Sequence, residues 1–504
     1  MKADNELYRK LRGKTCAALW QEDVPRLLAA QEPERSRLAA VVRALAGAAA
    51  ERGNDEEKER TRVWLRKLLH DESAKIRRYA AAALPKLGDD SGAETAILSR
   101  LEAAQEPRER AALADALEKV GGEASLRAAP AELEGVRSRL EARAARTATD
   151  SAADLEAMLP AGLEVTLHTR TGLADLAAQE AKETLAKFAE VNVMDPSRVQ
   201  LLFRAPFRLI DILQGRCWTQ LGIVIGDIRS RTAVSAIRPL AARIAAPLST
   251  GVLRGATVGP VRYRIQVPRE LASADFALAV AEEVRALAPD LLNDSRETPW
   301  TVMLFPIAGG IRAELRPRLT PDPRFAYRLG DIPAASHPPL AAAMARLAGK
   351  RQGEVIWDPF CGSGLELIER ARLGGVERLI GTDIDAAAID IARRNLEAAQ
   401  LTHVRSRLMV SNFKDYAKIP ELTPGTVTLV ISNPPMGRRL EVPDLRGLFL
   451  DLFRAATDAL APGGRLIFPN PLKLDAPDPR LQLVHRSSVD MGGYSCQLER
   501  WDRK

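Results

Sequence analysis

Cysteine and histidine are scarce in this sequence of 504 residues, which contains four of the first and five of the second. The cysteines Cys16, Cys217, Cys361 and Cys496 are far apart, and no two of them form a Cys-x-x-Cys pair. This spacing argues against a zinc site and against a disulfide framework. The histidines form no cluster either. We therefore expect no metal and a reducing, cytoplasmic environment.

Long apolar runs are also missing. No stretch approaches the roughly 18 apolar residues of a membrane helix, and the first six residues lack the apolar core of a signal peptide. Hydrophobic residues make up 46% of the chain, which is typical of folded domains. The length predicts about three domains in a soluble protein without a membrane partner. A net charge of +7 favours a nucleic-acid partner.

A strand, a tight loop and a helix are predicted around residues 354–365. An apolar run over 354–357 ends at Asp358, and a helical pattern begins at Leu365. Between them, Gly362 and Gly364 permit a sharp turn and a close approach of backbone to a ligand. The third glycine of a dinucleotide-binding loop is replaced by Leu367, which disfavours a pyrophosphate ligand.

Polar residues follow the next two predicted strands. Asp383 comes about 20 residues after the glycine loop, where an acid accepts hydrogen bonds from ribose hydroxyls. Asp385 is predicted to cap the following helix. The strand over 404–410 is followed by Asn412 and Phe413, which can meet the edge and the face of an adenine. Alternating strands and helices with polar strand ends predict a doubly wound sheet that binds a nucleoside without phosphates.

These residues, together with Asn433-Pro434-Pro435 after a fourth strand over 426–431, resemble the class I S-adenosylmethionine-dependent methyltransferases that modify a planar nitrogen. The resemblance implies a Rossmann-like α/β domain with a seven-stranded sheet over residues 331–504. It implies S-adenosylmethionine as cofactor and no metal, with Asp358 at the amino group of the methionine part. The implied cofactor-binding residues are Asp358, Phe360, Gly362, Gly364, Asp383, Asn412 and Phe413. Ser336 or His337 would also lie near the nucleoside.

The implied catalytic residues are Asn433, Pro434, Pro435 and Met436. An exocyclic amine on a ring is a poor nucleophile because its lone pair is delocalised. The side-chain carbonyl of Asn433 and the backbone carbonyl of Pro434 can each accept one N–H, which aims the lone pair at the methyl group. The family usually has an aromatic ring at the position of Met436 and an acid at the position of Asn412. Arg438 and Arg439 would hold the phosphate of a flipped nucleotide.

Residues 151–330 have an α+β pattern. Strands are predicted at 163–169, 198–203, 261–267, 300–305 and 311–315, and helices at 173–188 and 274–288. This order before a methyltransferase domain resembles a THUMP domain with its ferredoxin-like lead-in, which implies RNA binding. Arg262 and Arg264 are predicted to share an exposed strand face, opposite the core residues Tyr263 and Ile265.

Residues 1–150 are rich in Ala, Leu, Arg and Glu with helical periodicity. Segments 77–88 and 110–121 align, so that Leu84 matches Leu117 and Gly88 matches Gly121. Such pairs resemble HEAT-type repeats; the alternative is a plain helical bundle. The region contains no predicted chemistry, and we expect it to bind a protein partner.

The multidomain chain is thus predicted to be an RNA methyltransferase of the tRNA or 23S rRNA guanine-N2 type that acts by base flipping. Three alternatives remain open. One is methylation of adenine N6, another is methylation of a glutamine amide in protein, and the third is a non-catalytic RNA-binding scaffold. The sequence does not identify the RNA or the modified nucleotide.

Overall fold

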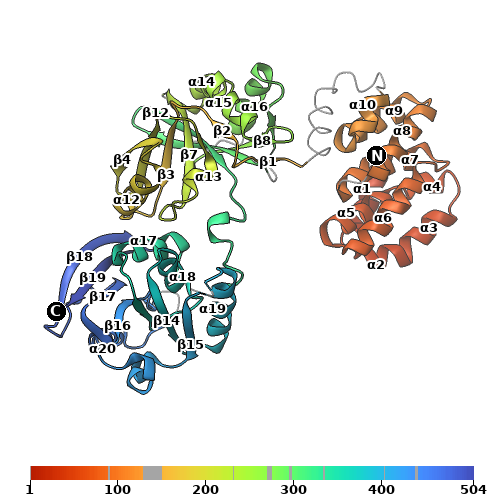
Figure 1. Ribbon diagram of the computed structural model, residues 1–504. Helices are drawn as coiled ribbons and strands as arrows, with labels where there is room; N and C mark the ends of the chain where they lie inside the picture. Colours follow the sequence, from red (N-terminus) through yellow and green to blue (C-terminus); the bar gives the residue numbers. More distant parts are fainter. Residues whose placement is uncertain are drawn as a thin grey trace. The chain divides into compact units, whose positions relative to one another are not determined.

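The computed structural model describes residues 2–88, 91–128, 150–230, 232–269, 275–294, 298–332, 335–401, 403–437 and 441–504. The chain forms two compact units, residues 1–150 and 151–504 (Figure 1). Among the described residues, no helix is long and apolar enough to cross a membrane. No group of three or more His, Cys, Asp or Glu side chains within these ranges is arranged to hold a metal ion.

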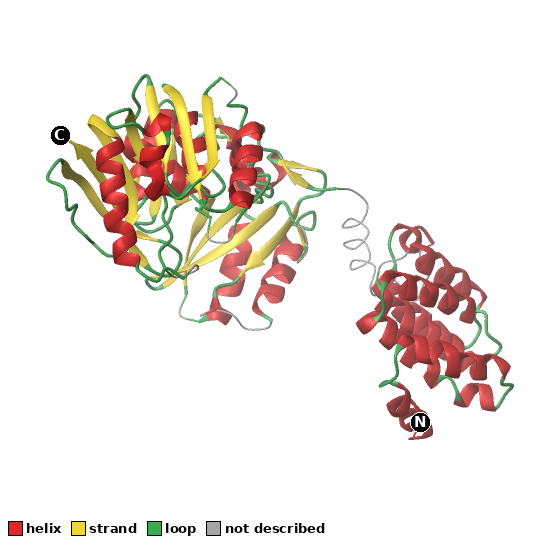
Figure 2. Ribbon diagram, turned by 90° about the horizontal axis from the view of Figure 1, so that it is seen from below, coloured by secondary structure: helices red, strands yellow, loops and turns green. Residues whose placement is uncertain are grey.

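The described part of the first unit is built from helices around its own core (Figure 2). Its α-helices are α1 (Lys2–Leu11), α2 (Cys16–Ala18), α3 (Val24–Ala29), α4 (Glu34–Arg37), α5 (Ala40–Arg52), α6 (Asp55–Leu68), α7 (Ala74–Ala83), α8 (Ser91–Ala103), α9 (Pro107–Val120) and α10 (Glu123–Ala128). The short helices η1 (Leu19–Asp23) and η2 (Leu84–Leu87) join them. Asn54 and Glu57 form a capping box that fixes the start of α6.

Three arginines of this unit make a recurring contact. The guanidinium groups of Arg35, Arg77 and Arg110 each donate to backbone carbonyls near the end of the preceding helix. Arg35 also pairs with Asp71, and Arg77 pairs with Glu109 in the same way. Because a helix end leaves carbonyls without partners, each arginine supplies donors near one helix end, and Arg35 and Arg77 also bond to a carboxylate further along the chain.

The second unit begins with an eight-stranded sheet in the order β10-β9-β11-β12-β7-β3-β5-β4. Its strands are β3 (Glu164–His168), β4 (Ala189–Asp195), β5 (Arg198–Phe203), β7 (Gln220–Arg229), β9 (Arg262–Gln266), β10 (Leu292–Asn293), β11 (Trp300–Ile307) and β12 (Gly310–Pro317). The helices are α12 (Ala174–Leu185), α13 (Leu209–Ile212), α14 (Ala233–Ile244), α15 (Pro247–Gly255), α16 (Phe276–Leu287) and η5 (Pro323–Phe325). Short strands β1 (Ala152–Ala153) and β2 (Met158–Leu159) pair with β8 (Thr257–Val258) and β6 (Phe207–Arg208).

Two features of this sheet differ from the sequence prediction. β4 and β7 were not predicted, and the predicted helix over 173–188 ends earlier because the chain turns into β4 at Ala189. Gly222 and Gly226 inside β7 obscure its strand pattern. Arg262 is only 8% exposed, whereas Arg264, two residues further along β9, is exposed as predicted. The edge strand β10 pairs with β9 at Arg262 and Tyr263 but not at Arg264.

A seven-stranded sheet follows, in the order β15-β14-β13-β16-β17-β19-β18. Its strands are β13 (Glu354–Asp358), β14 (Val376–Asp383), β15 (Arg405–Val410), β16 (Val427–Ile431), β17 (Leu460–Asn470), β18 (Leu481–Asp490) and β19 (Ser495–Arg503). Helices α17 (Pro338–Ala348), α18 (Leu365–Arg372), α19 (Ala386–Ala398), η6 (Phe413–Lys418), η7 (Pro420–Leu422) and α20 (Leu445–Ala459) connect them. The strands are parallel except β19, which runs antiparallel to both neighbours.

Both faces of this sheet are buried. Ile356 packs with the residues of α18 and α19, while the adjacent Trp357 packs with α20 on the other face. Side chains alternate between the faces of a strand, so covered faces require consecutive apolar residues. The parallel strands bring the ends of β13, β14, β15 and β16 to one edge of the sheet.

A charged triad is buried where β13 begins. Glu354 contacts Arg370 of α18 and Arg465 of β17, and all three side chains are at most 1% exposed. Burial lowers the pKa of Arg370 and of Arg465 to about 10. The triad therefore ties a helix and two strands together at the sheet's amino-terminal side.

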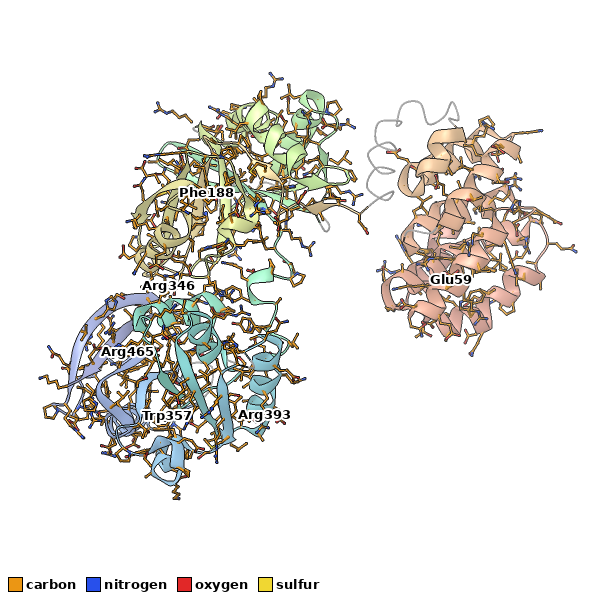
Figure 3. The ribbon with its side chains drawn as sticks, in the orientation of Figure 1. Glu59, Phe188, Arg346, Trp357, Arg393 and Arg465 are labelled. Carbon is orange, nitrogen blue, oxygen red and sulfur yellow. The ribbon has the colours of Figure 1, made fainter. Side chains whose placement is uncertain are left out.

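The two sheets of the second unit are joined by further ion pairs. Arg216 bonds to both carboxylate oxygens of Glu369 on α18, at 2.7 Å each, and Tyr327 donates to the same group. Arg346 of α17 pairs with Glu180 of α12 at 2.9 Å (Figure 3). These half-buried to buried pairs attach the first sheet to the helices that flank the second.

Candidate active site

Asp358 ends β13 and is fully buried. Its Oδ1 accepts hydrogen bonds from the hydroxyl of Ser432 and from the backbone N–H of Phe360, whereas its Oδ2 has no partner. Burial, and next the nearby Glu366 carboxyl, raise the pKa of Asp358 well above its usual range. A ligand cation at Oδ2 would supply the missing partner and favour the ionised form. A buried carboxylate oxygen without a partner is suited to binding an amino group.

The glycine loop between β13 and α18 has the predicted strand, loop and helix order. Gly362 and Gly364 have φ angles of +49° and +82°, which residues other than glycine rarely adopt. A Cβ at Gly362 would lie 2.9 Å from the Ile332 side chain. The N–H of Gly362 donates to Asp383 Oδ2 at 2.9 Å, so the loop is attached to the end of the neighbouring strand.

Asp383 ends β14 and is half-buried. Its Oδ1 accepts the N–H of Asp385 at 3.0 Å. Each carboxylate oxygen has room for a further hydrogen bond, so the group can still accept ribose hydroxyls. Asp385 caps α19 through the N–H of Ala387, which confirms the prediction for that residue.

Asn412 and Phe413 follow β15. Asn412 is exposed, and its Oδ1 accepts the N–H of Lys414 at the start of η6. Phe413 is 4% exposed and belongs to the core beside Phe360, with ring centroids 4.7 Å apart. The expected open face of Phe413 is therefore mostly covered, because η6 turns the ring into the core. Phe360 is half-buried and lies over it.

Asn433 follows β16 and is half-buried. Its Nδ2 donates to Ser336 Oγ at 2.8 Å, while its Oδ1 is buried without a hydrogen-bond partner. Ser336 in turn donates to the buried carboxylate of Glu366. Pro434 is buried and Pro435 is half-buried beside it. The loop thus holds an amide oxygen that can still accept one N–H.

Met436 contacts residues that the sequence analysis missed. Its sulfur accepts hydrogen bonds from the Tyr494 hydroxyl at 3.3 Å and from the Cys496 thiol at 3.5 Å. Tyr494 precedes β19, and its separation from Met436 by 58 residues leaves no local pattern to detect. An aromatic residue therefore lies beside the loop although position 436 lacks one. Arg438 and Arg439 lie outside the described residues.

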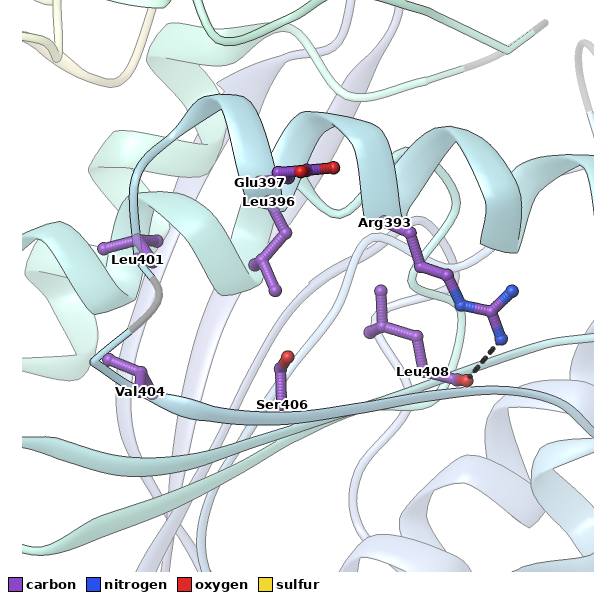
Figure 4. Close-up of a pocket in the computed structure, with 7 residues that line it drawn as sticks. All are labelled: Arg393, Leu396, Glu397, Leu401, Val404, Ser406 and Leu408. Atoms are coloured by element: carbon purple, nitrogen blue, oxygen red, sulfur yellow. Dashed lines mark hydrogen bonds between the residues drawn. The ribbon is translucent and has the colours of Figure 1, made fainter.

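A pocket of about 390 Å³ lies elsewhere, between α19 and the edge strand β15 (Figure 4). It is lined by Arg393, Leu396, Glu397, Leu401, Val404, Ser406 and Leu408. Arg393 donates to the backbone carbonyl of Leu408 across it. None of these residues was predicted to act in the site, and the pocket forms no part of it.

The strand order, the glycine loop and the polar strand ends define a class I methyltransferase fold. A family described as "RMKL-like, methyltransferase domain" matches residues 326–475. The chain is 33% identical over 190 residues to tRNA (guanine(6)-N2)-methyltransferase from Thermus thermophilus, covering 36% of this chain and 53% of that one. It is 30% identical over 139 residues to the probable tRNA (guanine(10)-N2)-dimethyltransferase of Methanothermococcus thermolithotrophicus, covering 27% of this chain and 82% of that one. The chain therefore belongs to the family of tRNA (guanine-N2)-methyltransferases.

Coverage of other curated relatives is lower. The chain spans 53%, 62% and 44% of the length of three of them. The crystal structure of TrmN from Thermus thermophilus is similar with a TM-score of 0.54 and 22% identity, over 68% of this chain and all of that one. A possible methylase from Clostridium difficile 630 is similar with a TM-score of 0.51 and 15% identity, over 68% and 98% of the two chains. These likenesses concern the fold.

Proposed function

We propose that this protein is an S-adenosylmethionine-dependent methyltransferase that modifies guanine N2 of tRNA. The buried Oδ1 of Asn433, which has no partner, is the observation that carries the proposal. An unpaired buried acceptor is costly in free energy, and an amine N–H of a substrate would remove that cost. The names of the relatives support guanine N2 and tRNA as the acceptor.

The residues at the strand ends fit the proposed cofactor. Asp358 offers Oδ2 to the ammonium group, and Asp383 offers its carboxylate to the ribose hydroxyls. Gly362 and Gly364 would bring backbone close to the ligand, and Phe360 and Asn412 would meet the adenine, with Phe413 packed behind Phe360. A related structure, SMU.472, was solved with SAH bound and shares this fold with a TM-score of 0.50. When bound, the cofactor supplies an electrophilic methyl group on a sulfonium.

The chain's own residues then orient the acceptor. Asn433 Oδ1 and the backbone carbonyl of Pro434 each accept one N–H of the amine, which aims its lone pair at the methyl group. Pro435 restricts the loop's φ angle and contributes no competing N–H. Met436 and the adjacent Tyr494 provide the surface beside the base. The proton released after transfer passes to solvent.

Residues 151–330 are proposed to bind the RNA, and residues 331–504 to catalyse the reaction. The elements β3, α12, β4, β5, α13 and β7 come in βαββαβ order, with only the two-residue β6 between β5 and α13, and their strands lie in the order β7-β3-β5-β4. That order supports a ferredoxin-like lead-in. The following helices α14 and α15, strand β9, helix α16, and strands β11 and β12 support a THUMP domain.

Residues 1–150 are proposed to be a HEAT-like repeat region that binds a protein partner. The recurring contacts of Arg35, Arg77 and Arg110 support the repeat, because the same arginine-to-carbonyl contact recurs along the unit. Repeats that contact only their neighbours form extended surfaces suited to binding other macromolecules.

The test is transfer of labelled methyl from S-adenosylmethionine to unmodified tRNA, rRNA and DNA, followed by digestion to nucleosides. We expect labelled N2-methylguanosine from the tRNA pool. Label in N6-methyladenosine would contradict the proposed acceptor. Cofactor binding without label in any pool would contradict RNA methylation and favour a protein acceptor or an RNA-binding scaffold.

Cofactor affinity is expected to depend on pH through Asp358. The raised pKa means that the carboxyl gains a proton as pH falls toward that value, and a neutral acid cannot pair with the ammonium group. The dissociation constant for SAH should therefore rise as the solution is acidified. Replacing Asp358 with Asn should weaken binding by about 10- to 100-fold at neutral pH and remove most of this dependence. Calorimetry across pH measures both effects, and a variant that keeps the same pH dependence would contradict the assignment.

A further inference from the structure

A buried hydrogen-bonded chain extends from the Asn433 amide to a carboxylate on α18. Asn433 Nδ2 donates to Ser336, which lies just before α17, and Ser336 donates to Glu366 in the first turn of α18. Ser336 is 7% exposed and Glu366 is 3% exposed. Neither residue can reach bulk water readily, so each depends on the other for its hydrogen bond.

We propose that Ser336 and Glu366 are positioning residues that set the orientation of the Asn433 amide, so that its oxygen and not its NH2 group is offered to the substrate amine. The inference rests on the proposed function, since it concerns the same amine acceptor. It adds two residues that do not touch the reacting atoms and that act only through Asn433.

The carboxylate of Glu366 determines which group donates and which accepts in each of these two hydrogen bonds. An ionised carboxylate only accepts hydrogen bonds, so Ser336 must give its single hydroxyl proton to Glu366. The Ser336 oxygen can then only accept, and the group of Asn433 that donates is Nδ2. Oδ1 is left without a partner, as observed. In the reversed orientation, Asn433 Oδ1 and the Ser336 oxygen, which are both acceptors, would face each other. The Asn433 NH2 group would then face the N–H of the substrate amine, and both of these are donors.

The charge around Glu366 makes this arrangement sensitive to pH. Glu369 on the same helix acts on the Glu366 carboxyl, while Glu366 and Asp383 both act on Asp358 at the end of β13. The buried thiol of Cys361 faces the same three acids, Asp358, Asp383 and Glu366. Arg216 pairs with Glu369 and not with Glu366. Burial raises the pKa of Glu366, with Glu369 adding to the rise. Once protonated, Glu366 can donate to Ser336, and the preference for one amide orientation is lost.

Ser336→Ala and Glu366→Gln test the proposal in the full-length protein. Single-turnover methyl transfer at saturating cofactor is measured across pH, with SAH affinity and the midpoint of thermal unfolding measured on the same samples. Ser336→Ala should lower the rate by about tenfold or more, with SAH affinity changed by less than about twofold. Ser488→Ala, which removes an exposed serine of β18, is the matched control. An unchanged rate in Ser336→Ala, or a loss fully explained by weaker SAH binding, would overturn the proposal.

Glu366→Gln tests whether the ionised carboxylate sets the orientation of the Asn433 amide. Like a protonated Glu366, the glutamine can donate to Ser336 through its NH2 group, and it does not titrate, so at neutral pH the variant should show the lowered rate that the wild type shows at acid pH. It should also lose the decline in rate at acid pH that Glu366 causes in the wild type. A wild-type acid limb that persists unchanged in Glu366→Gln contradicts the role of this carboxylate.

A readout independent of turnover is the side-chain amide signal of Asn433, observed by NMR after selective asparagine labelling. Its NH2 protons should exchange slowly with solvent in the wild type and rapidly in Ser336→Ala. Equal exchange in both proteins would overturn the proposal even if the wild type methylates no RNA. Slow exchange without methylation would instead leave the positioning chain intact and contradict the proposed function.

Discussion

Replacing Asn433 with alanine is expected to reduce the rate of methyl transfer by about 10²- to 10³-fold, the effect of removing one preorganised polar group from an active site. The variant loses the buried Oδ1 that would accept an N–H of the amine. The Pro434 carbonyl alone cannot hold the amine in one orientation. Because the Asn433 side chain bonds to Ser336 and not to Asp358 or Asp383, SAH affinity should stay within about twofold of the wild type.

Single-turnover assays with labelled cofactor measure this loss, and SAH titration controls for folding of the site. Asn433→Asp is the informative companion, since it retains an acceptor oxygen but cannot donate to Ser336. It should fall between the wild type and Asn433→Ala. Full activity in Asn433→Ala would rule out the amide as the group that binds the amine.

Replacing Glu354 with leucine is expected to destabilise the second unit by about 3–5 kcal/mol. The change leaves the guanidinium groups of Arg370 and Arg465 buried without their carboxylate. Burial lowers the pKa of both arginines to about 10, because a buried guanidinium charge is costly. Urea unfolding measures the loss as a lower midpoint.

Two further variants make this prediction specific. Glu397→Gln changes an exposed glutamate of α19 and should alter stability by less than about 0.5 kcal/mol. A variant with apolar residues at all three triad positions should be more stable than Glu354→Leu, because no buried charge then remains unpaired. A loss below about 1 kcal/mol for Glu354→Leu would mean that the arginines reach water or other partners.

Local sequence patterns were sufficient to predict the strands that end at or just before Asp358, Asp383 and Asn433. Consecutive apolar residues indicate strands covered on both faces, and the polar residues that end them must meet at one edge of a parallel sheet. The glycines at positions 362 and 364 mark the loop for a local reason, since their φ angles suit glycine. These features depend on residues near one another along the chain.

The burial of single residues was less predictable. Arg262 and Arg264 have equivalent places in the alternating pattern, yet Arg262 is buried and Arg264 is exposed. Phe413 was expected beside the cofactor, and it packs in the core under Phe360. In each case, the neighbouring strand or helix determines which part of the face is covered.

The sequence by itself therefore determined the order of the catalytic strands and the polar residue at each strand end, since those depend on spacing and local geometry. Only the tertiary structure decided how the site is supported. Ser336, Glu366 and Asn433 come from three segments, and Tyr494 reaches Met436 from a fourth. Hydrogen bonds between distant segments leave no periodic signal in the sequence, because they depend on how the fold brings the segments together and not on the spacing of residues along the chain.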